Sequence, residues 1–147
     1  INISYKTNYK TSDVFSIQYQ GVGYIVDAPY PKHFFFTTNI DLNTGERICL
    51  NDFIDIDDDF TKQFQKRSIL QSENYQLKEW VFENWKSMQT IELEKLLSQA
   101  DQRGKGIFTY FTPTTLGVSI AVPHALGDHI EFEMEYQWLS EYVREKN

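Results

Sequence analysis

The chain has 147 residues, of which 41% are hydrophobic and 16% are aromatic, and its formal net charge is −7 at pH 7. This composition excludes a disordered chain, and the excess of acidic residues opposes binding to nucleic acid or to anionic lipid surfaces. A single cysteine cannot form an internal disulfide, and no apolar run approaches the roughly 20 residues of a membrane-spanning helix. We expect one domain over residues 1–147.

The N-terminal part alternates polar and apolar residues, which is typical of half-buried strands. The second expected strand places Phe15, Ile17 and Tyr19 on one face. Two prolines in the segment DAPYPKH exclude it from the interior of a sheet. We expect a turn at residues 11–13 and strands over residues 1–9, 13–26 and 34–42.

The stretch NIDLNTGERICL, residues 39–50, has two interpretations, a calcium loop and a hairpin. An EF-hand loop needs glycine at position 6 and glutamate at position 12. Counting from Asp41 instead places Gly45 fifth and Asp52 twelfth. A three-residue turn with Gly45 in the left-handed conformation fits this spacing. We therefore expect a hairpin, with Cys49 buried and inert on its second strand.

The aspartates of DFIDIDDDF, residues 52–60, also have two interpretations. Three of them repeat the first ligand positions of a calcium loop: Asp55, Asp57 and Asp59. However, Phe60 and Lys66 stand where such a loop needs glycine and glutamate. Aspartates in the first turn of a helix accept hydrogen bonds from free backbone N–H groups. We expect this capping role, at the start of a helix over residues 58–70.

An apolar period close to 3.6 over residues 72–100, with a break near Ser87, predicts two further helices. Two glycines in DQRGKG end this helical segment. The remaining elements are strands over residues 106–112, 116–122 and 128–136 and a short helix within residues 137–147. The pattern predicts an α+β domain, in which an antiparallel sheet of N- and C-terminal strands carries the central helices on one face.

The last expected strand alternates strictly between apolar and acidic residues. Its apolar side holds Ile130, Phe132, Met134 and Tyr136, and its acidic side holds Glu131, Glu133 and Glu135. Carboxylates on one strand face are spaced at about 7 Å and concentrate negative potential. The glutamate row is therefore either an ordinary solvated face or a docking surface for a cationic partner.

No metal, cofactor or catalytic site is predicted. His124 and His129 offer two zinc ligands, whereas even a catalytic zinc site needs three from the protein. The chain has no Gly-x-Ser-x-Gly motif, and Cys49 has no identifiable base. Tyr30 and His33, in the proline-bent loop, either pack on their own domain or present an aromatic contact to a sugar or a protein.

Two segments resemble a known family: TTNIDLNTGERICLNDFI, residues 37–54, and FTYFTPTTLGVSIAVPHALGDHIEFEMEYQWLSEYV, residues 108–143. They resemble the two ends of a bacterial extracytoplasmic domain found in the lysozyme-sensing anti-sigma factor RsiV and in the peptidoglycan deacetylase PdaC. In that family a hairpin precedes the helices and a Y-x-x-L segment closes the domain, matched here by Tyr136 and Leu139. The segment DAPYPKH departs from the Ala-His-Pro-like element of many relatives.

The resemblance implies a non-catalytic binding or sensing module that works outside the cytoplasm. The implied partners are a basic protein such as lysozyme or a cell-wall glycan. An accessory or catalytic domain of a glycan-processing hydrolase of the cell envelope is the alternative. Because the chain begins with Ile1 and not with methionine, we expect it to be periplasmic, secreted or anchored through a preceding segment.

Overall fold

The computed structural model describes residues 1–71 and 74–145. The N-terminal strands form one antiparallel sheet in the order β1-β2-β3, and the C-terminal strands form a second in the order β4-β5-β6. The predicted α+β class, with antiparallel strands from both ends of the chain and helices between them, is confirmed. In chain order the elements are β1 (Asn2–Lys10), β2 (Val14–Gly23), β3 (Lys32–Asp41), α1 (Leu50–Phe53), α2 (Asp58–Gln71), α3 (Tyr75–Ser87), α4 (Thr90–Ser98), β4 (Ile107–Phe111), β5 (Thr115–Ala121), the 3-10 helix η1 (His124–Leu126), β6 (His129–Glu135) and α5 (Tyr136–Leu139).

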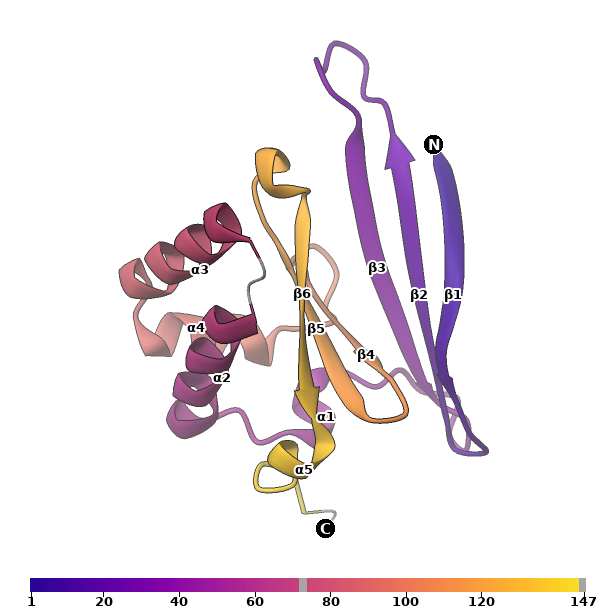
Figure 1. Ribbon diagram of the computed structural model, residues 1–147. Helices are drawn as coiled ribbons and strands as arrows, with labels where there is room; N and C mark the ends of the chain where they lie inside the picture. The colour runs from indigo at the N-terminus through magenta and orange to yellow at the C-terminus, as the bar shows by residue number, and fades with distance from the viewer. Residues whose placement is uncertain (72–73, 146–147) are drawn as a thin grey trace.

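The elements stack in three layers (Figure 1): helices α2, α3 and α4, then the β4–β6 sheet, then the β1–β3 sheet. Side chains, not strand pairing, connect the two sheets. The amide nitrogen of Asn39 on β3 donates to the carbonyl of Thr109 on β4 at 2.9 Å. The backbone N–H of Phe111 on β4 donates to the hydroxyl of Ser16 on β2 at 3.0 Å. The strands from the two ends of the chain therefore form two sheets that pack against each other.

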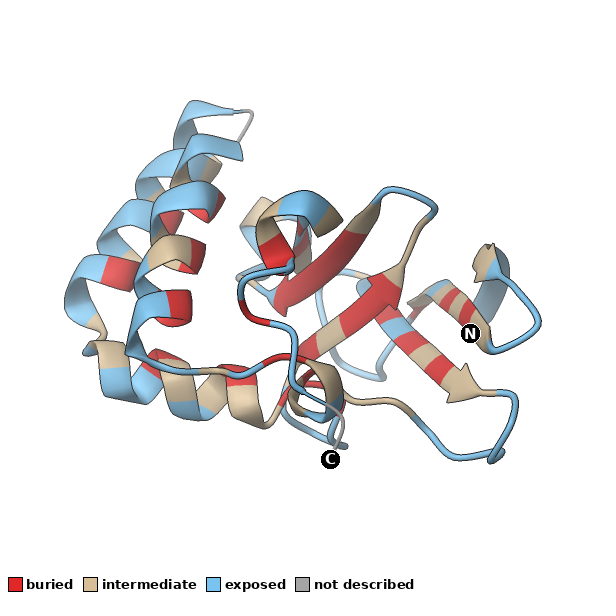
Figure 2. Ribbon diagram, turned by 90° about the horizontal axis from the view of Figure 1, so that it is seen from below, coloured by how far each residue is buried: buried red, intermediate tan, exposed pale blue. Residues whose placement is uncertain are grey.

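The hydrophobic core lies between the helices and one face of the β4–β6 sheet. The ring of Phe64 on α2 meets Phe132 on β6 edge-on, with 5.9 Å between ring centroids. The indole N–H of Trp85 on α3 donates to the hydroxyl of Ser68 at 2.8 Å, so this buried polar group is satisfied. Figure 2 shows buried residues on the sides of the helices that face the sheet and exposed residues on their outer sides.

The β1–β3 sheet turns a polar face toward the rest of the molecule. Ser16 and Gln18 of β2 are buried, whereas the apolar side chains between and beside them are only partly buried. The hydroxyl of Ser16 donates to the amide oxygen of Asn39 at 2.7 Å, which satisfies both groups. The predicted strand is present and ends at Gly23 rather than at residue 26. Its apolar side, with Phe15, Ile17 and Tyr19, is not the side that faces the second sheet.

The turn at residues 43–45 is confirmed, but the strand expected after it is not. Gly45 has a φ of 74°, and the carboxylate of Asp41 accepts from the N–H of Asn43 at 2.8 Å. After a single bridge from Ile40 to Arg47 the chain enters helix α1. Cys49 is the half-exposed N-cap of that helix, and its N–H donates to Asp52 at 2.6 Å. This local capping interaction overrides the apolar pattern on which the expected strand rested.

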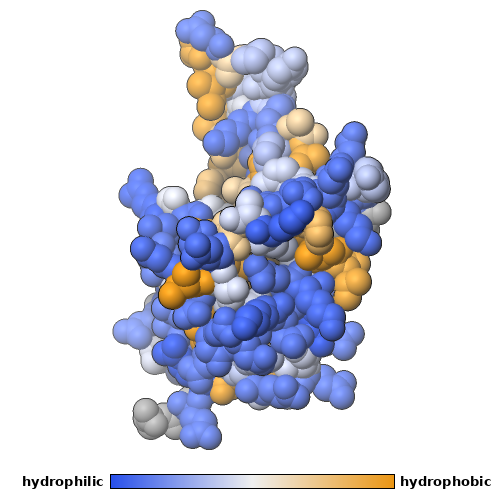
Figure 3. Space-filling model, turned by 90° about the vertical axis from the view of Figure 1, so that its left-hand side faces the viewer, coloured by the Kyte–Doolittle hydropathy of each residue, from blue (hydrophilic) through white to orange (hydrophobic). Residues whose placement is uncertain are grey.

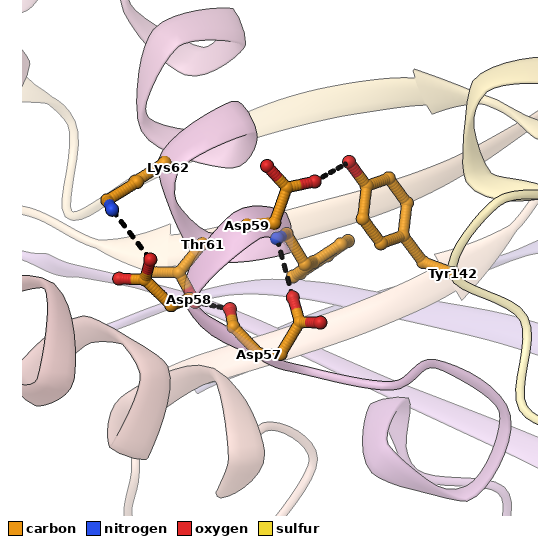
Figure 4. Close-up of polar contacts among 7 residues, drawn as sticks. Asp57, Asp58, Asp59, Thr61, Lys62 and Tyr142 are labelled. Atoms are coloured by element: carbon orange, nitrogen blue, oxygen red, sulfur yellow. Dashed lines mark hydrogen bonds and ion pairs between the residues drawn. The ribbon is translucent and has the colours of Figure 1, made fainter.

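The aspartates that precede and begin α2 have separate structural partners (Figure 4). Asp57 accepts from the N–H of Phe60 at 2.8 Å, which confirms the predicted capping. Asp58 pairs with Lys62 at 2.6 Å, and Asp59 accepts from the hydroxyl of Tyr142 at 2.7 Å. Burial, together with this hydrogen bond to Asp59, raises the pKa of Tyr142 to about 12. The cluster therefore organises the start of α2 and ties it to the C-terminal segment.

Replacing Asp57 with alanine is expected to lower the free energy of unfolding by about 1 kcal/mol, because the N–H of Phe60 loses its cap. Asp58→Ala is the matched control, since its carboxylate makes only an exposed pair with Lys62 and should cost less than about 0.5 kcal/mol. Urea unfolding of the two variants measures the difference. Equal losses would contradict the capping role.

The central helices confirm the predicted break, because α3 ends at Ser87 and α4 begins at Thr90. The expected start at Ser72 lies outside the described residues. The C-terminal helix is shorter than expected: α5 is followed by a bridge between Val143 and Ile54. Residues 146–147 of the expected helix also lie outside the described part of the chain.

A buried carboxylate joins the loop after α4 to both α1 and β4. Asp101 has a φ of 68° and accepts from the N–H of Leu50 at 3.0 Å, the N–H of Thr109 at 2.7 Å and the hydroxyl of Thr109 at 2.6 Å. Burial raises the pKa of Asp101, against the hydrogen bonds that favour its ionised form. These contacts hold the first half of β4 next to the start of α1.

Candidate functional site

A polar cleft lies between the two sheets. A hollow of about 320 Å³ is bounded by residues of the β1–β3 sheet and by His129 of β6. It adjoins a hollow of about 210 Å³ along β1 and β2, since both are lined by Ser4 and Gln20. A third, of about 380 Å³, is lined by Tyr110, Glu131 and Glu133 together with Gln71 of α2. It shares no lining residue with the other two, but Glu131 in it contacts His129 of the first hollow at 3.3 Å. We call this region the inter-sheet cleft; its polar lining is Asn2, Ser4, Lys6, Gln18, Gln20 and His33 on one sheet and Tyr110, His129, Glu131 and Glu133 on the other.

Two carboxylates of the cleft meet at one phenol. The hydroxyl of Tyr110 lies 2.9 Å from Glu131 and 3.3 Å from Glu133. Glu131 also contacts the Nε2 atom of His129 at 3.3 Å. The ring of Tyr110 packs directly over Gly117, where a Cβ atom would stand 2.0 Å from its Cζ. Gly117 is therefore what allows the phenol to lie between the carboxylates.

The contacts of Glu131 favour its ionised form. The hydrogen bond from His129 lowers the pKa of Glu131 against the opposing effect of burial, and Tyr110 and the charge of Lys6 lower it further. Burial and the two glutamates raise the pKa of Tyr110, so the phenol remains a proton donor. Within residues 1–71 and 74–145, Glu131 and Glu133 form no ion pair with a lysine or arginine. Their negative charge is not neutralised by a permanent cation.

The facing sides of the two sheets also have unused hydrogen-bonding capacity. Among the described side chains, the hydroxyl of Thr37 and the Nδ1 atom of His129 are buried without a hydrogen-bond partner in the protein. The ring of His129 stacks on Phe35, with 4.5 Å between centroids, which fixes its orientation. Buried polar atoms without a partner are rare in folded proteins. Both atoms are themselves withdrawn from solvent, so a ligand in the cleft would not reach them directly.

The structure places the glutamate row at two different sites. Glu131 and Glu133 lie at Tyr110 in the cleft, whereas Glu135 lies at the far end of β6, where it precedes α5; all three residues are exposed. The predicted alternation is confirmed, because the apolar side of β6 is buried and the acidic side is exposed. Only the first two glutamates of the row therefore belong to the cleft.

Tyr30 and His33 contact a second cluster, next to η1. The rings of Tyr30 and His124 stack with 5.6 Å between centroids, and the N–H of His33 donates to Asp128 at 2.8 Å. Asp128 also contacts the Nδ1 atom of His124 at 3.0 Å. Burial raises the pKa of Asp128, but the contacts with His33 and His124 outweigh it and the net shift is downward. Tyr30 remains 65% exposed, so the loop both packs on its own domain and presents an aromatic ring.

The sequence interpretation missed Tyr110, His129 and the amides of β2 as cleft residues. The amides had a visible signal, because Gln18 and Gln20 alternate on the polar side of a strand whose other side is apolar. Tyr110 had none, because its role depends on the register of β4 and β6 on either side of β5. In the described parts of the chain, no group of three or more His, Cys, Asp or Glu residues is arranged to hold a metal ion.

Comparison with known proteins places the fold. No family model and no curated protein matches the sequence. The structure is similar to a member of the DUF3298 family from Bacteroides fragilis, with a TM-score of 0.62 and 12% identity over 97% of this chain and 53% of that one. It is also similar to a DUF3298 protein from Pseudomonas aeruginosa, with a TM-score of 0.57 and 15% identity over 97% of this chain and 61% of that one. At these low identities the similarity shows a shared fold and nothing further.

This chain thus spans between half and two thirds of the length of these DUF3298 structures. The shared fold agrees with the α+β domain predicted from the sequence. None of the helices in residues 1–71 and 74–145 combines the length and the apolar character that crossing a bilayer would require.

Proposed function

We propose that this chain is a non-catalytic binding module of the bacterial cell envelope, and that its ligand is held in the inter-sheet cleft. The observation that carries the proposal is that Glu131 and Glu133 both accept from the hydroxyl of Tyr110. Among the described residues, neither glutamate forms an ion pair with a lysine or arginine. A carboxylate pair that forms no ion pair with a lysine or arginine of its own chain attracts a cationic side chain.

The ligand that fits this site is a basic segment of a protein. A lysine or arginine side chain can donate to both glutamates, and the amides of the opposite wall, Gln18 and Gln20, can bind the backbone around it. The net charge of −7 would attract such a partner from a distance. Lysozyme, a basic protein that the resemblance to RsiV suggests, is the first ligand to test.

A cell-wall glycan is the rival ligand for the same cleft. Amide and hydroxyl side chains such as Asn2, Ser4 and Gln20 suit sugar hydroxyls as well as peptide groups. The two ligands differ in their dependence on charge, because a neutral sugar gains little from the carboxylates. Salt dependence therefore separates them.

A glycan-processing hydrolase is the alternative class of function. Such enzymes use two carboxyl groups, one of which has a raised pKa so that it can act as a general acid. Here the pKa of Glu131 is lowered, which favours a binding role over acid catalysis. Turnover of glycan substrates that disappears in Glu131→Gln would establish the hydrolase instead.

The location outside the cytoplasm is part of the proposal and rests on the resemblance to the RsiV and PdaC domains. Cell fractionation of the full-length gene product tests it. Recovery of the protein in the cytoplasmic fraction would remove the support for an envelope ligand without changing the chemistry of the cleft.

Replacing Glu131 and Glu133 together with glutamine is expected to weaken lysozyme binding at least about tenfold in 0.05 M salt, because charge is removed and shape is kept. The matched control, Glu79→Gln with Glu94→Gln on α3 and α4, changes the net charge equally. Calorimetric titration of both double variants at low and at physiological salt measures the difference.

Two outcomes of this experiment contradict the basic-protein ligand. Equal weakening in both double variants would assign the effect to overall charge and not to the cleft. Binding of peptidoglycan fragments that survives Glu131→Gln with Glu133→Gln but is lost in Gln20→Ala would assign the cleft to a glycan.

A further inference from the structure

The side of the β1–β3 sheet that faces away from the second sheet, which we call the outer face, is apolar and aromatic. The strand register aligns Tyr5, Tyr19 and Phe36 in one row across the three strands. The next row on one side is Ile3, Gly21 and Phe34, and rows on the other side contain Ile17 and then Phe15 with Ile40. Aspartate and glutamate are absent from these rows, and lysines occur only at the two ends, Lys10 and Lys32.

Another element covers the outer face at one edge, where the ring of Phe36 packs edge-on against Phe108 of β4 with 5.4 Å between ring centroids. The β1–β3 sheet lies on the side of the molecule away from the helices (Figure 1), and apart from the contact of Phe36 it meets β4 and β6 with its inner, polar face. Tyr5 is 74% exposed and Phe36 is 45% exposed. The helical side of the molecule is, in contrast, mostly hydrophilic, while hydrophobic atoms line the projecting tip of the β2–β3 hairpin (Figure 3). A contiguous apolar face that extends over three strands and is largely exposed marks an interaction surface.

We infer that a second copy of this chain covers the outer face. The charge distribution favours this partner, because each chain has a net charge of −7 and two copies repel each other unless they meet where carboxylates are absent. The outer face is the sheet surface that meets this condition. A symmetric pairing would also place the aromatic row of one copy against the apolar rows of the other.

The size of the face sets the strength of the pairing. Three strands of nine to ten residues span about 34 Å by about 14 Å. Pairing of two such faces buries about 1,000 Å² in total, which is at the lower end of specific interfaces. The dimer should therefore be weak and concentration-dependent, with a dissociation constant on the order of 10–100 μM.

Sedimentation equilibrium over protein concentrations from about 1 μM to about 500 μM tests the inference. The average mass should rise from the 17.4 kDa of one chain toward twice that value. Phe36→Asp and, separately, Tyr5→Asp should each raise the dissociation constant at least about tenfold, because a carboxylate is forced into the apolar interface. Both side chains are exposed, so the variants should fold, which circular dichroism checks.

Phe82→Asp is the matched control, because Phe82 lies on α3 and is 47% exposed, close to the 45% of Phe36. This variant should dimerise like the unchanged protein. A constant monomer mass over the whole range would overturn the inference, and so would a dimer that both outer-face substitutions leave intact. A dimer that Phe82→Asp weakens as much as Phe36→Asp would assign the association to another surface.

Discussion

Replacing Asp101 with asparagine is expected to lower the free energy of unfolding by about 2–3 kcal/mol. The carboxylate accepts from the N–H of Leu50 and from both the N–H and the hydroxyl of Thr109. Asparagine keeps one oxygen, but its NH₂ group would face the N–H of Leu50 and leave that buried donor without an acceptor. Urea unfolding of the purified variant gives the loss directly.

Asp27→Asn is the matched control for this prediction. Asp27 has a φ of 67°, almost the same left-handed conformation as the 68° of Asp101, but it is exposed. Asparagine tolerates this conformation, so the control should change stability by less than about 0.5 kcal/mol. Similar losses in both variants would assign the effect to backbone conformation and not to the buried hydrogen bonds.

The stability difference at Asp101 should also depend on pH. Burial raises the folded-state pKa of this carboxyl above its unfolded value. A raised pKa contributes stability that is fully present below the unfolded pKa and is lost as pH rises through the folded pKa. Asparagine lacks this contribution, so the gap between the unchanged protein and the variant should widen as the pH falls toward 4, near the unfolded pKa of aspartate.

Replacing Gly117 with alanine is expected to cost about 2–3 kcal/mol and to abolish binding in the inter-sheet cleft. The new Cβ atom would stand 2.0 Å from the Tyr110 ring, so the buried ring has to move. Its hydroxyl would then leave Glu131 and Glu133. Thermal or urea unfolding measures the first effect, and the lysozyme titration measures the second.

Two further variants separate steric clash from other causes. Tyr110→Phe keeps the ring and removes only the hydroxyl, which should cost about 1 kcal/mol. Gly104→Ala introduces a Cβ at a φ of 79° where no atom lies within 4 Å, so it tests backbone strain alone, at about 1 kcal/mol. If Gly117→Ala proved no worse than Gly104→Ala, the packing of Tyr110 over Gly117 would not be what holds the phenol in place.

The sequence was sufficient to predict the features that depend on interactions between residues close together in the chain. The capping by Asp57, the turn at Gly45 and the alternation along β6 each depend on residues a few positions apart. The prediction of a strand around Cys49 was wrong, and the cause is again local: Asp52 accepts from the N–H of Cys49 and makes Cys49 the N-cap of α1. Local chemistry decided these cases, whether or not the pattern was interpreted correctly.

The arrangement of the two sheets could not be predicted in this way. It depends on contacts such as the hydrogen bond from Asn39 to Thr109, two residues that are 70 positions apart. Within the second sheet, the register that places Tyr110 opposite Gly117 and Gly117 opposite Glu133 brings the phenol to Glu131 and Glu133. The sequence therefore indicated the acidic side of β6 as a candidate surface, but neither the phenol between its carboxylates nor the polar wall opposite them.

A carboxamide at the end of α2 protects the β4–β6 sheet against growth from one side. β6 is an edge strand, and an unpaired edge invites another chain to add a strand and begin aggregation. The side chain of Gln71 donates to the carbonyl of Glu133 at 2.5 Å and accepts from its N–H at 2.8 Å, as a neighbouring strand would. One glutamine thus blocks the middle of this edge, so that β6 can present its acidic side chains to solvent without offering its backbone to other copies.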